Sequence, residues 1–419
     1  MYPQFDSFRS KKGGTVQKGS VATCSAPPAP TYRYAENTPA LGSDRMSTTR
    51  PRYAGLDQLR GVLACGVMAY HFLHWCHLDE TLTPWVRQPL ELVGLYAVAT
   101  FYALSGAALA VVYAGRTVDQ PFLAEFALKR AFRILPLCWL VTTAALALNR
   151  FVPIVEQPGR VLLCYSMLFS WVDPTAYYAV GAWSIGNEWA FYTLFPIFLW
   201  AFRRAGWIGG TAALVITITS AYWWWFQMRS DVPVGDQWAM YIHPINQWAL
   251  FAGGMGVGRL IAVRRSFAGW AVIALGTLAF LAIAWSSDPN RWVYGGVRVA
   301  LVGVAIAWCY GAGRLPDRPS RLGHVVTWLG DRSYAIYLLH PFAYRFTRSI
   351  MNRLPSGVER AWEWLGFDVT SVLMAAVAAL AMAHVSFLYF ERPLVRWGRS
   401  LIGSRGETRP LSVTPKAEP

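Results

Sequence analysis

Charged residues are scarce in this chain. Only 15% of its 419 residues are Asp, Glu, Lys or Arg, whereas 55% are hydrophobic, and a soluble globular domain carries roughly a quarter of charged residues. The charges lie between long apolar blocks such as 269–285 and 369–390, which approach the ~20 residues that a helix needs to cross a bilayer. The composition excludes an ordinary soluble protein and predicts a membrane protein.

Acidic residues are in shorter supply than basic ones, with 23 Asp and Glu against 38 Lys and Arg. The resulting net charge of +15 would suit a nucleic-acid partner, but the basic residues do not gather in one run. Most of them follow or precede an apolar block, as expected of cytoplasmic loops in membrane proteins. Membrane topology explains the charge, and we expect no nucleic-acid partner.

Cysteine motifs and a signal peptide are also missing. The six cysteines are scattered and form no CxxC pair, which argues against a disulfide framework and a zinc site. Residues 1–52 are polar and contain no apolar stretch with a cleavage site, so they are predicted to be a disordered cytoplasmic tail. A second cytoplasmic tail is predicted for 398–419, which leaves 53–397 as the transmembrane domain.

The apolar blocks predict an all-α membrane protein with about ten transmembrane helices and both termini in the cytoplasm. Basic residues alternate between the loops as the positive-inside rule requires, although Arg348, Arg353 and Arg360 fall in a predicted outer loop. The predicted spans are 56–78, 90–113, 134–150, 183–202, 207–227, 245–263, 268–286, 293–311, 325–347 and 369–391.

Residues 160–180 do not fit this alternation. They are apolar enough to insert, but Asp173 and Pro174 interrupt them. A full span here would place Arg203 and Arg204 outside and invert every later loop. A re-entrant or surface segment, surrounded by protein, is the better prediction.

The first predicted span contains a histidine at a depth where ionisable groups are costly. His71 follows Arg60 by eleven residues, which is about three turns and about 16 Å along one helix face. Intramembrane ionisable residues usually face a cavity or a partner, and a histidine suits proton transfer near neutral pH. A neutral histidine bonded between two helices is an equally good interpretation of this segment alone.

His74 and His77 continue the series at a spacing of three. This spacing drifts around a helix, and no carboxylate clearly completes a site, so no metal is predicted. Both histidines are expected near the outer surface of the membrane.

Four other segments carry polar residues that can serve either a site or helix packing. Tyr102 and Ser105 lie among small residues that allow close helix contact. Arg130 and Arg133 are one turn apart on the cytoplasmic side, where they can grip a phosphate or simply anchor the helix. Two further groups combine an ionisable residue with aromatic or hydroxyl side chains near the membrane: Trp183, Ser184 and Glu188, and Tyr334, His340 and the helix-kinking Pro341.

Taken in order, these segments resemble the acyltransferase-3 family of polytopic membrane acyltransferases, from about Tyr53 to Trp397. Gln58, Tyr102 and Ile185 differ from the residues that are common in the family, but the ionisable residues are intact. The matching motifs are Leu-Asp-x-Leu-Arg-Gly at 56–61, Phe-Tyr-x-Leu-Ser-Gly at 101–106, Arg-x-x-Arg at 130–133, Trp-Ser-x-x-x-Glu-x-x-Phe-Tyr at 183–192 and Ser-Tyr-x-x-Tyr-Leu-x-His at 333–340.

The resemblance implies transfer of an acyl group, usually acetyl from acetyl-CoA, to a hydroxyl of a carbohydrate or glycan. It would make His71 and Glu188 catalytic, with His71 as general base or transient acyl carrier. Arg60, Arg130 and Arg133 would bind the CoA donor. The substrate-binding residues would be Tyr102, Ser105, Trp183, Ser184, Tyr334 and His340.

The resemblance also implies a multi-pass protein of a bacterial inner membrane in contact with membrane lipid. Some family members carry a soluble esterase-like domain after the last span. None is evident here, so such a partner would act in trans. A transporter of a glycan or an acylated lipid is the alternative, because it would also place His, Glu and Arg in the membrane.

Overall fold

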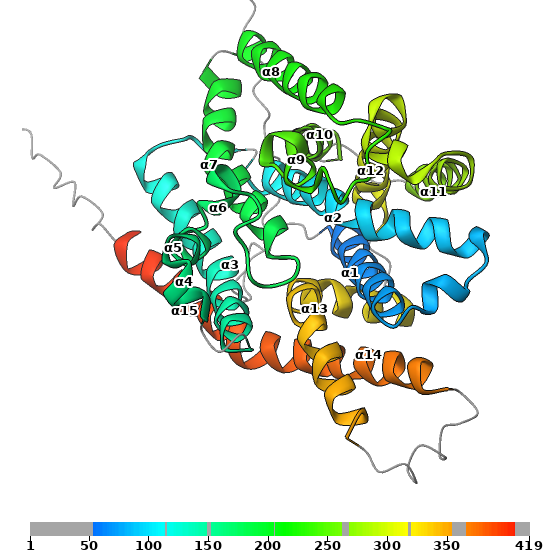
Figure 1. Cartoon of the computed structure of the whole chain (residues 1–419). Coiled ribbons are helices and arrows are strands. Elements are labelled where there is room, and N and C mark those ends of the chain that lie inside the picture. Colours follow the sequence, from blue (N-terminus) through cyan, green and yellow to red (C-terminus); the bar gives the residue numbers. More distant parts are fainter. Residues whose placement is uncertain are drawn as a thin grey trace, which may run out of the picture. The chain divides into compact units, whose positions relative to one another are not determined.

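The computed structural model describes residues 53–113, 115–148, 152–204, 206–261, 268–316, 320–353 and 366–406. All regular structure in these ranges is helical (Figure 1), which confirms the all-α class. Ten of the described helices have 18 or more residues: α1 (Ala54–Trp75), α2 (Pro84–Tyr113), α3 (Gln120–Leu148), α7 (Ala182–Arg204), α8 (Gly206–Gln227), α10 (Pro244–Ile261), α11 (Ala268–Ser286), α12 (Gly295–Arg314), α13 (Arg321–Met351) and α14 (Phe367–Ser386).

The remaining described elements are short or lie at the C-terminal end. A π-helical segment, η4 (Phe387–Glu391), joins α14 to α15 (Arg392–Gly406), so the helix runs into the segment predicted as the second tail. The predicted first tail lies outside the described residues. The short elements are η1 (Leu78–Thr81), α4 (Val152–Glu156), α5 (Pro158–Ser166), α6 (Phe169–Val172), α9 (Trp238–Tyr241) and η2 (Pro289–Val293).

The ten long helices fall on the ten predicted spans. Within the described part of the chain, five stretches are long and apolar enough to cross a membrane: α2, α3, α11, α12 and the stretch Phe367–Ile402. Three of the other long helices, α1, α7 and α13, are less apolar because they contain the polar residues of the motifs. Membrane character is therefore established, while ten crossings stay a prediction.

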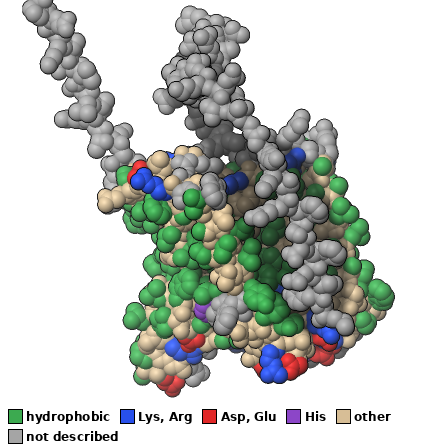
Figure 2. All heavy atoms as spheres, turned by 90° about the horizontal axis from the view of Figure 1, so that it is seen from above, with side chains coloured by type: hydrophobic (Ala, Val, Ile, Leu, Met, Phe, Trp, Pro, Cys, Tyr) green, Lys and Arg blue, Asp and Glu red, His purple; other side chains and the backbone are tan. Residues whose placement is uncertain are grey.

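The surface agrees with a membrane location. On the face in Figure 2, hydrophobic side chains cover the middle of the molecule, and the Lys, Arg, Asp and Glu side chains in view gather toward its upper and lower ends. Large apolar residues are exposed along the helices, among them Leu214 on α8, Leu275 on α11 and Val377 on α14. Apolar patches of this extent are stable against lipid rather than water.

The segment 160–180 contains no helix long enough to cross a membrane. Two short helices, α5 and α6, are joined at Met167, whose φ of 60° breaks the helical path, and an irregular stretch leads from Asp173 to α7. This break agrees with the prediction that no full span lies here. Whether the segment re-enters the membrane stays a prediction.

Helices α1 and α13 approach each other closely at two glycines. A Cβ atom on Gly61 would lie 2.6 Å from the backbone nitrogen of Gly330, and one on Gly330 would lie 2.0 Å from the carbonyl oxygen of Asp57. Glycine is the residue that permits such backbone contact between membrane helices. Ten residues further along each helix, about 15 Å away, are His71 and His340, so this contact aligns the two histidines.

We predict that Gly330→Leu destabilises the protein by roughly 3 kcal/mol, because a side chain placed against backbone cannot be accommodated by a rotamer change. The midpoint temperature of unfolding in detergent micelles measures this. Gly303→Leu on α12 is the control, because a Cβ there meets no described atom within 4 Å. Equal midpoints for the two variants would contradict the contact.

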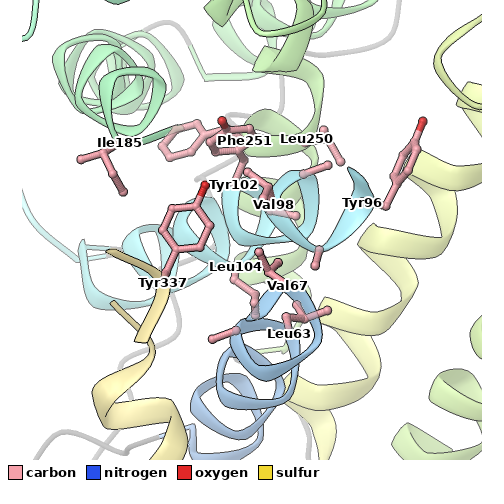
Figure 3. Packing of buried hydrophobic residues seen from close by; sticks show 14 of the residues in the cluster. Leu63, Val67, Tyr96, Val98, Tyr102, Leu104, Ile185, Leu250, Phe251 and Tyr337 are labelled. Atoms are coloured by element: carbon pink, nitrogen blue, oxygen red, sulfur yellow. The ribbon is translucent and has the colours of Figure 1, made fainter. Parts of the chain in front are cut away.

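Helix α2 forms the centre of the bundle and packs on α10 through the same kind of contact. A Cβ on Gly106 would lie 2.1 Å from the carbonyl oxygen of Phe251, and one on Gly254 would lie 2.0 Å from that of Ala103. In Figure 3, Tyr102 and Phe251 pack together, with Val67 of α1 on the other side of α2. This core fixes α1, α2 and α7 around the polar residues described next.

Candidate functional site

His71 and His340 form a direct pair. The Nδ1 atom of His71 lies 2.9 Å from Nε2 of His340, and Nδ1 of His340 lies 3.2 Å from the carbonyl oxygen of Ile336. The rings lie 13° from parallel with centroids 5.1 Å apart. His340 is buried, whereas His71 is partly exposed.

The hydrogen bonds assign the protons of a neutral pair. A carbonyl oxygen only accepts, so Nδ1–H of His340 donates to Ile336 and its Nε2 accepts. Nδ1–H of His71 then donates to His340, which leaves the lone pair of His71 on Nε2. An imidazole held in this tautomer, with Nε2 as its basic atom, is suited to accept a proton from a hydroxyl.

Pro341 helps to explain the position of the His340 ring. Proline has no N–H, so it leaves the carbonyl of Tyr337 without its helical donor. The imidazole of His340 interacts with this carbonyl as well as with that of Ile336. The sequence His-Pro therefore ties the ring to its own helix.

Trp75, one turn after His71, covers both imidazoles. Its ring is nearly parallel to His71, at 4.9 Å between centroids, and to His340, at 5.8 Å. Stacking of this kind restricts both rings to one orientation. The pair is thus held by hydrogen bonds along its edge and by an indole on its face.

Glu188 is bound by two hydroxyls. Ser105 Oγ of α2 donates to Oε1 of Glu188 at 2.7 Å, and the hydroxyl of Tyr192, one turn along α7, donates to the same oxygen. Ser105 Oγ and the Tyr192 hydroxyl are 2.9 Å apart. Glu188 thus forms a cluster with Ser105 and Tyr192, whereas the residue that hydrogen-bonds to His71 is His340.

Three arginines, Arg60, Arg130 and Arg133, lie near one another, and two of them, Arg130 and Arg133, interact with Tyr192. The guanidinium of Arg130 lies 5.6 Å from the Tyr192 ring centroid and 5.8 Å from that of Phe126, and its buried Nε has no hydrogen-bond partner among the described residues. Arg133 is exposed and interacts electrostatically with Arg130 and Arg60. Asp57, 3.5 Å from Arg60, and Glu188 near Arg133 offset part of this repulsion. Three neighbouring cations with an unbonded donor among them still favour an anionic ligand.

Helix α13 runs from the arginines to the histidines and contacts both. The Tyr334 hydroxyl donates to the carbonyl of Ile134 at 2.7 Å, next to Arg133. One turn on, the Tyr337 hydroxyl accepts from Ser184 Oγ at 2.9 Å, and its ring lies 6.2 Å from that of His340. Tyr334, Tyr337 and His340 thus lie on successive turns of α13 between the arginine cluster and the histidine pair.

Tyr102 and Trp183 have structural partners. The Tyr102 hydroxyl accepts from Asn187 Nδ2 at 3.2 Å, and Asn187 also donates to the carbonyl of Ile242 at 2.7 Å. Trp183 packs edge-on against Trp238 at 5.4 Å. These contacts fix the start of α7 and so the position of Glu188.

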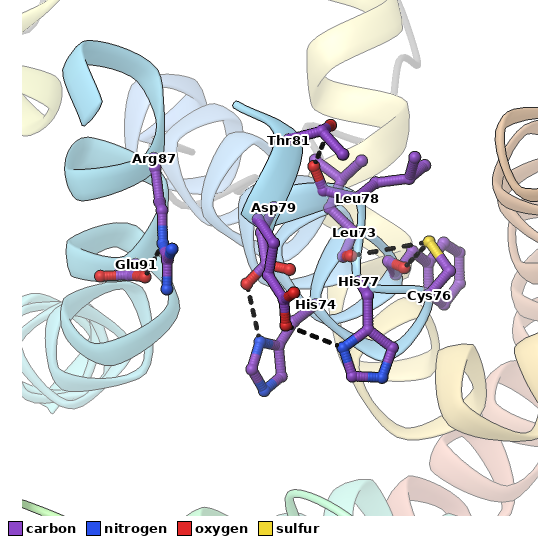
Figure 4. A network of polar contacts seen from close by, with 11 residues as sticks. Leu73, His74, Cys76, His77, Leu78, Asp79, Thr81, Arg87 and Glu91 are labelled. Carbon is purple, nitrogen blue, oxygen red and sulfur yellow. Dashed lines mark hydrogen bonds and ion pairs between the residues drawn. The ribbon is translucent and has the colours of Figure 1, made fainter. Parts of the chain in front are cut away.

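A second polar network lies beyond the histidine pair, around η1 (Figure 4). His74 Nδ1 lies 2.8 Å from Oδ2 of the buried Asp79, and His77 Nδ1 lies 3.0 Å from Oε1 of the exposed Glu80. His77 has a φ of 58°, which ends α1 earlier than the predicted span. Among the described residues, no group of three or more His, Cys, Asp or Glu side chains could hold a metal ion.

The Asp79 contact makes stability depend on pH. Burial disfavours the carboxylate, but the hydrogen bond and charge of His74 and the charge of Arg87 outweigh it, so the pKa of Asp79 is lowered from 3.8. The stabilisation is therefore complete above pH 3.8 and is lost as the pH falls through the lower folded-state value.

We predict that the unfolding midpoint of Asp79→Asn is lower than that of the wild type at neutral pH, and that the difference narrows below pH 3.8. Thermal unfolding in micelles across the pH range measures it. Glu80→Gln, which breaks only an exposed contact, should differ little from the wild type. A difference for Asp79→Asn that is independent of pH would contradict the assignment.

The predicted site residues do not include Tyr192, Trp75 or Tyr337, although Tyr192 and Tyr337 are positions of the matched motifs. Tyr192 and Trp75 each lie four residues after a predicted site residue, and Tyr337 lies three before His340. Helical spacing was therefore a usable signal for all three. The pairing of His71 with His340 had no such signal, because 269 residues separate them.

Comparison with known proteins identifies the family. A family model described as an acyltransferase domain, that of acyltransferase family 3, matches residues 53–390. The acyltransferase MdmB of Streptomyces mycarofaciens is 26% identical over an alignment of 387 residues, and the match covers 87% of this chain and 95% of the relative. No solved structure matches the chain. The chain is an acyltransferase and belongs to the acyltransferase-3 family.

Proposed function

We propose that this acyltransferase moves an acetyl group from acetyl-CoA to a hydroxyl of a carbohydrate or glycan acceptor. The observation that carries the proposal is the histidine pair, in which His340 fixes the tautomer of His71 and leaves Nε2 as a base. We also propose that the chain lies in a bacterial inner membrane with both termini in the cytoplasm. We propose a separate esterase-like protein as a partner in trans.

In the proposed reaction, His71 Nε2 accepts the proton of the acceptor hydroxyl as its oxygen attacks the thioester carbonyl. The C–S bond then breaks, and the CoA thiolate takes the proton from the imidazolium. Hydroxyls near the site would stabilise the oxyanion of the tetrahedral intermediate. His340 acts through His71 and is a positioning residue in this scheme.

The arginine cluster supports a CoA donor. Phosphate groups are recognised by guanidinium groups in paired geometry, and Arg60, Arg130 and Arg133 come from two different helices. Their position on the predicted cytoplasmic side is where acetyl-CoA is available. The row of Tyr334, Tyr337 and His340 leads from this cluster to the proposed base.

The test is an assay with purified protein in micelles. We expect saturable binding of acetyl-CoA and slow release of CoA in the absence of acceptor, because water can replace the hydroxyl. A transporter would do neither. Absence of both acetyl-CoA binding and CoA release would overturn the proposal.

A further inference from the structure

A large apolar cavity lies apart from the histidine pair and from the cluster of Arg60, Arg130 and Arg133. Its volume is about 650 Å³, and it is enclosed by α7, α8, α10 and α12 with one residue, Ala110, from α2. Among the residues that the structure describes, the lining is almost entirely apolar, and Arg259 of α10 is its one charged residue. The volume is in the range of sites that bind small molecules, roughly 300–1,000 Å³.

Small residues create the space. Gly253, Gly256, Ala249 and Ala252 present no bulk toward the cavity from α10, and Ala221 does the same from α8. A Cβ on Gly256 would meet no described atom within 4 Å. Larger groups such as Phe198, Leu214 and Trp225 complete the lining.

The cavity is closed toward the proposed donor site. Phe195 of α7 lines it and is only 1% exposed. Its other side stacks on Phe126 at 5.4 Å, and Phe126 in turn faces Arg130. The acyl group of a donor held by the arginines would have to displace this wall, so the cavity does not serve the donor.

We propose that this cavity is a binding site for one membrane phospholipid with an anionic headgroup. An acyl chain would fill the apolar space between α8 and the other helices, and the phosphate would lie at Arg259. Arg259 is exposed and lies in a region that the charge alternation assigns to the cytoplasmic surface, where cationic residues attract anionic lipids. The charge of Arg259 thus matches the anionic headgroup, and the apolar lining matches the acyl chain.

The test measures retained lipid. Full-length protein is purified in mild detergent, exchanged into nanodiscs that contain phosphatidylglycerol and phosphatidylcholine, and then analysed by native mass spectrometry. We expect one phosphatidylglycerol to be retained by the wild type and at least tenfold less by Gly256→Phe, which fills the cavity. Phenylalanine is a better helix former than glycine, so folding should survive.

Gly303→Phe is the matched control, because Gly303 is exposed on α12, outside the cavity, with equal space for a Cβ. It should retain lipid as the wild type does. Equal retention by Gly256→Phe and the wild type, or equal loss in both variants, would overturn the site.

Two further arms identify the ligand. Arg259→Gln should abolish the preference for phosphatidylglycerol over phosphatidylcholine, and Arg259→Lys should keep it. An unchanged preference in Arg259→Gln would overturn the headgroup assignment. Displacement of the retained lipid by palmitoyl-CoA would overturn the lipid as occupant in favour of a donor chain. Neither arm depends on the proposed glycan acceptor or on the role of His71.

Discussion

His71→Ala should lower the turnover number of acyl transfer by roughly 10²- to 10⁴-fold, the range that a positioned general base contributes. The variant keeps the helix, since alanine is the best helix former, and should accumulate in the membrane as the wild type does. The KM for acetyl-CoA should change little, because the arginine cluster remains. Single-turnover assays with matched amounts of membrane protein measure both constants.

His340 distinguishes a base with a fixed tautomer from a merely buried histidine. His340→Phe removes the acceptor for Nδ1–H of His71 and should reduce turnover by roughly 10- to 100-fold, as loss of an orienting partner does in metal sites. His340→Gln offers a carbonyl oxygen to the same N–H and should recover part of the loss. Wild-type turnover in His71→Ala, or no recovery from His340→Phe to His340→Gln, would contradict the scheme.

Replacing Arg133 by alanine should raise the KM for acetyl-CoA by roughly 10- to 150-fold, since a hydrogen bond to a charged group contributes about 1.5–3 kcal/mol. The turnover number should stay within a few-fold of the wild type. Arg133→Lys keeps the charge but loses the paired geometry, so its KM should lie between the two. Steady-state kinetics at fixed acceptor concentration give these values.

A donor analogue tests the same contact from the other side. Acetyl-dephospho-CoA lacks the 3′-phosphate, so the wild type should bind it more weakly than acetyl-CoA. If Arg133 contacts that phosphate, Arg133→Ala should bind both donors about equally. A KM for acetyl-CoA that is unchanged in Arg133→Ala would contradict donor binding by the cluster.

The helices were predictable because they follow from a local property, the length of the apolar blocks. The prediction for 268–286 coincides with α11. The helix ends were harder to predict than the helices themselves. Helix α13 continues from Arg321 to Met351, beyond the predicted 325–347, because a helix can extend past the apolar block that crosses the bilayer. In contrast, α1 ends at Trp75, before the predicted end of the span at 78, and His77 after it has a positive φ. The apolar pattern does not predict this backbone conformation.

The site residues were predictable as types but not as partners. An ionisable residue within an apolar block is rare, so His71, Glu188 and His340 can be recognised as candidates from the sequence. The partner of each is set by helix contacts between distant segments. Gly61 and Gly330 bring His71 to His340, and the packing of α2 against α7 brings Ser105 to Glu188. The cavity beside α8 could not be predicted from the sequence for the same reason, because it depends on how distant helices pack.

The most direct test is mass spectrometry of surface polysaccharide from cells that lack the gene, complemented with the wild type or with His71→Ala. The account predicts that an acyl substituent disappears with the gene, returns with the wild type and stays absent with His71→Ala present in the membrane at equal amount. A polysaccharide whose acyl content is the same in all of these cells would contradict it.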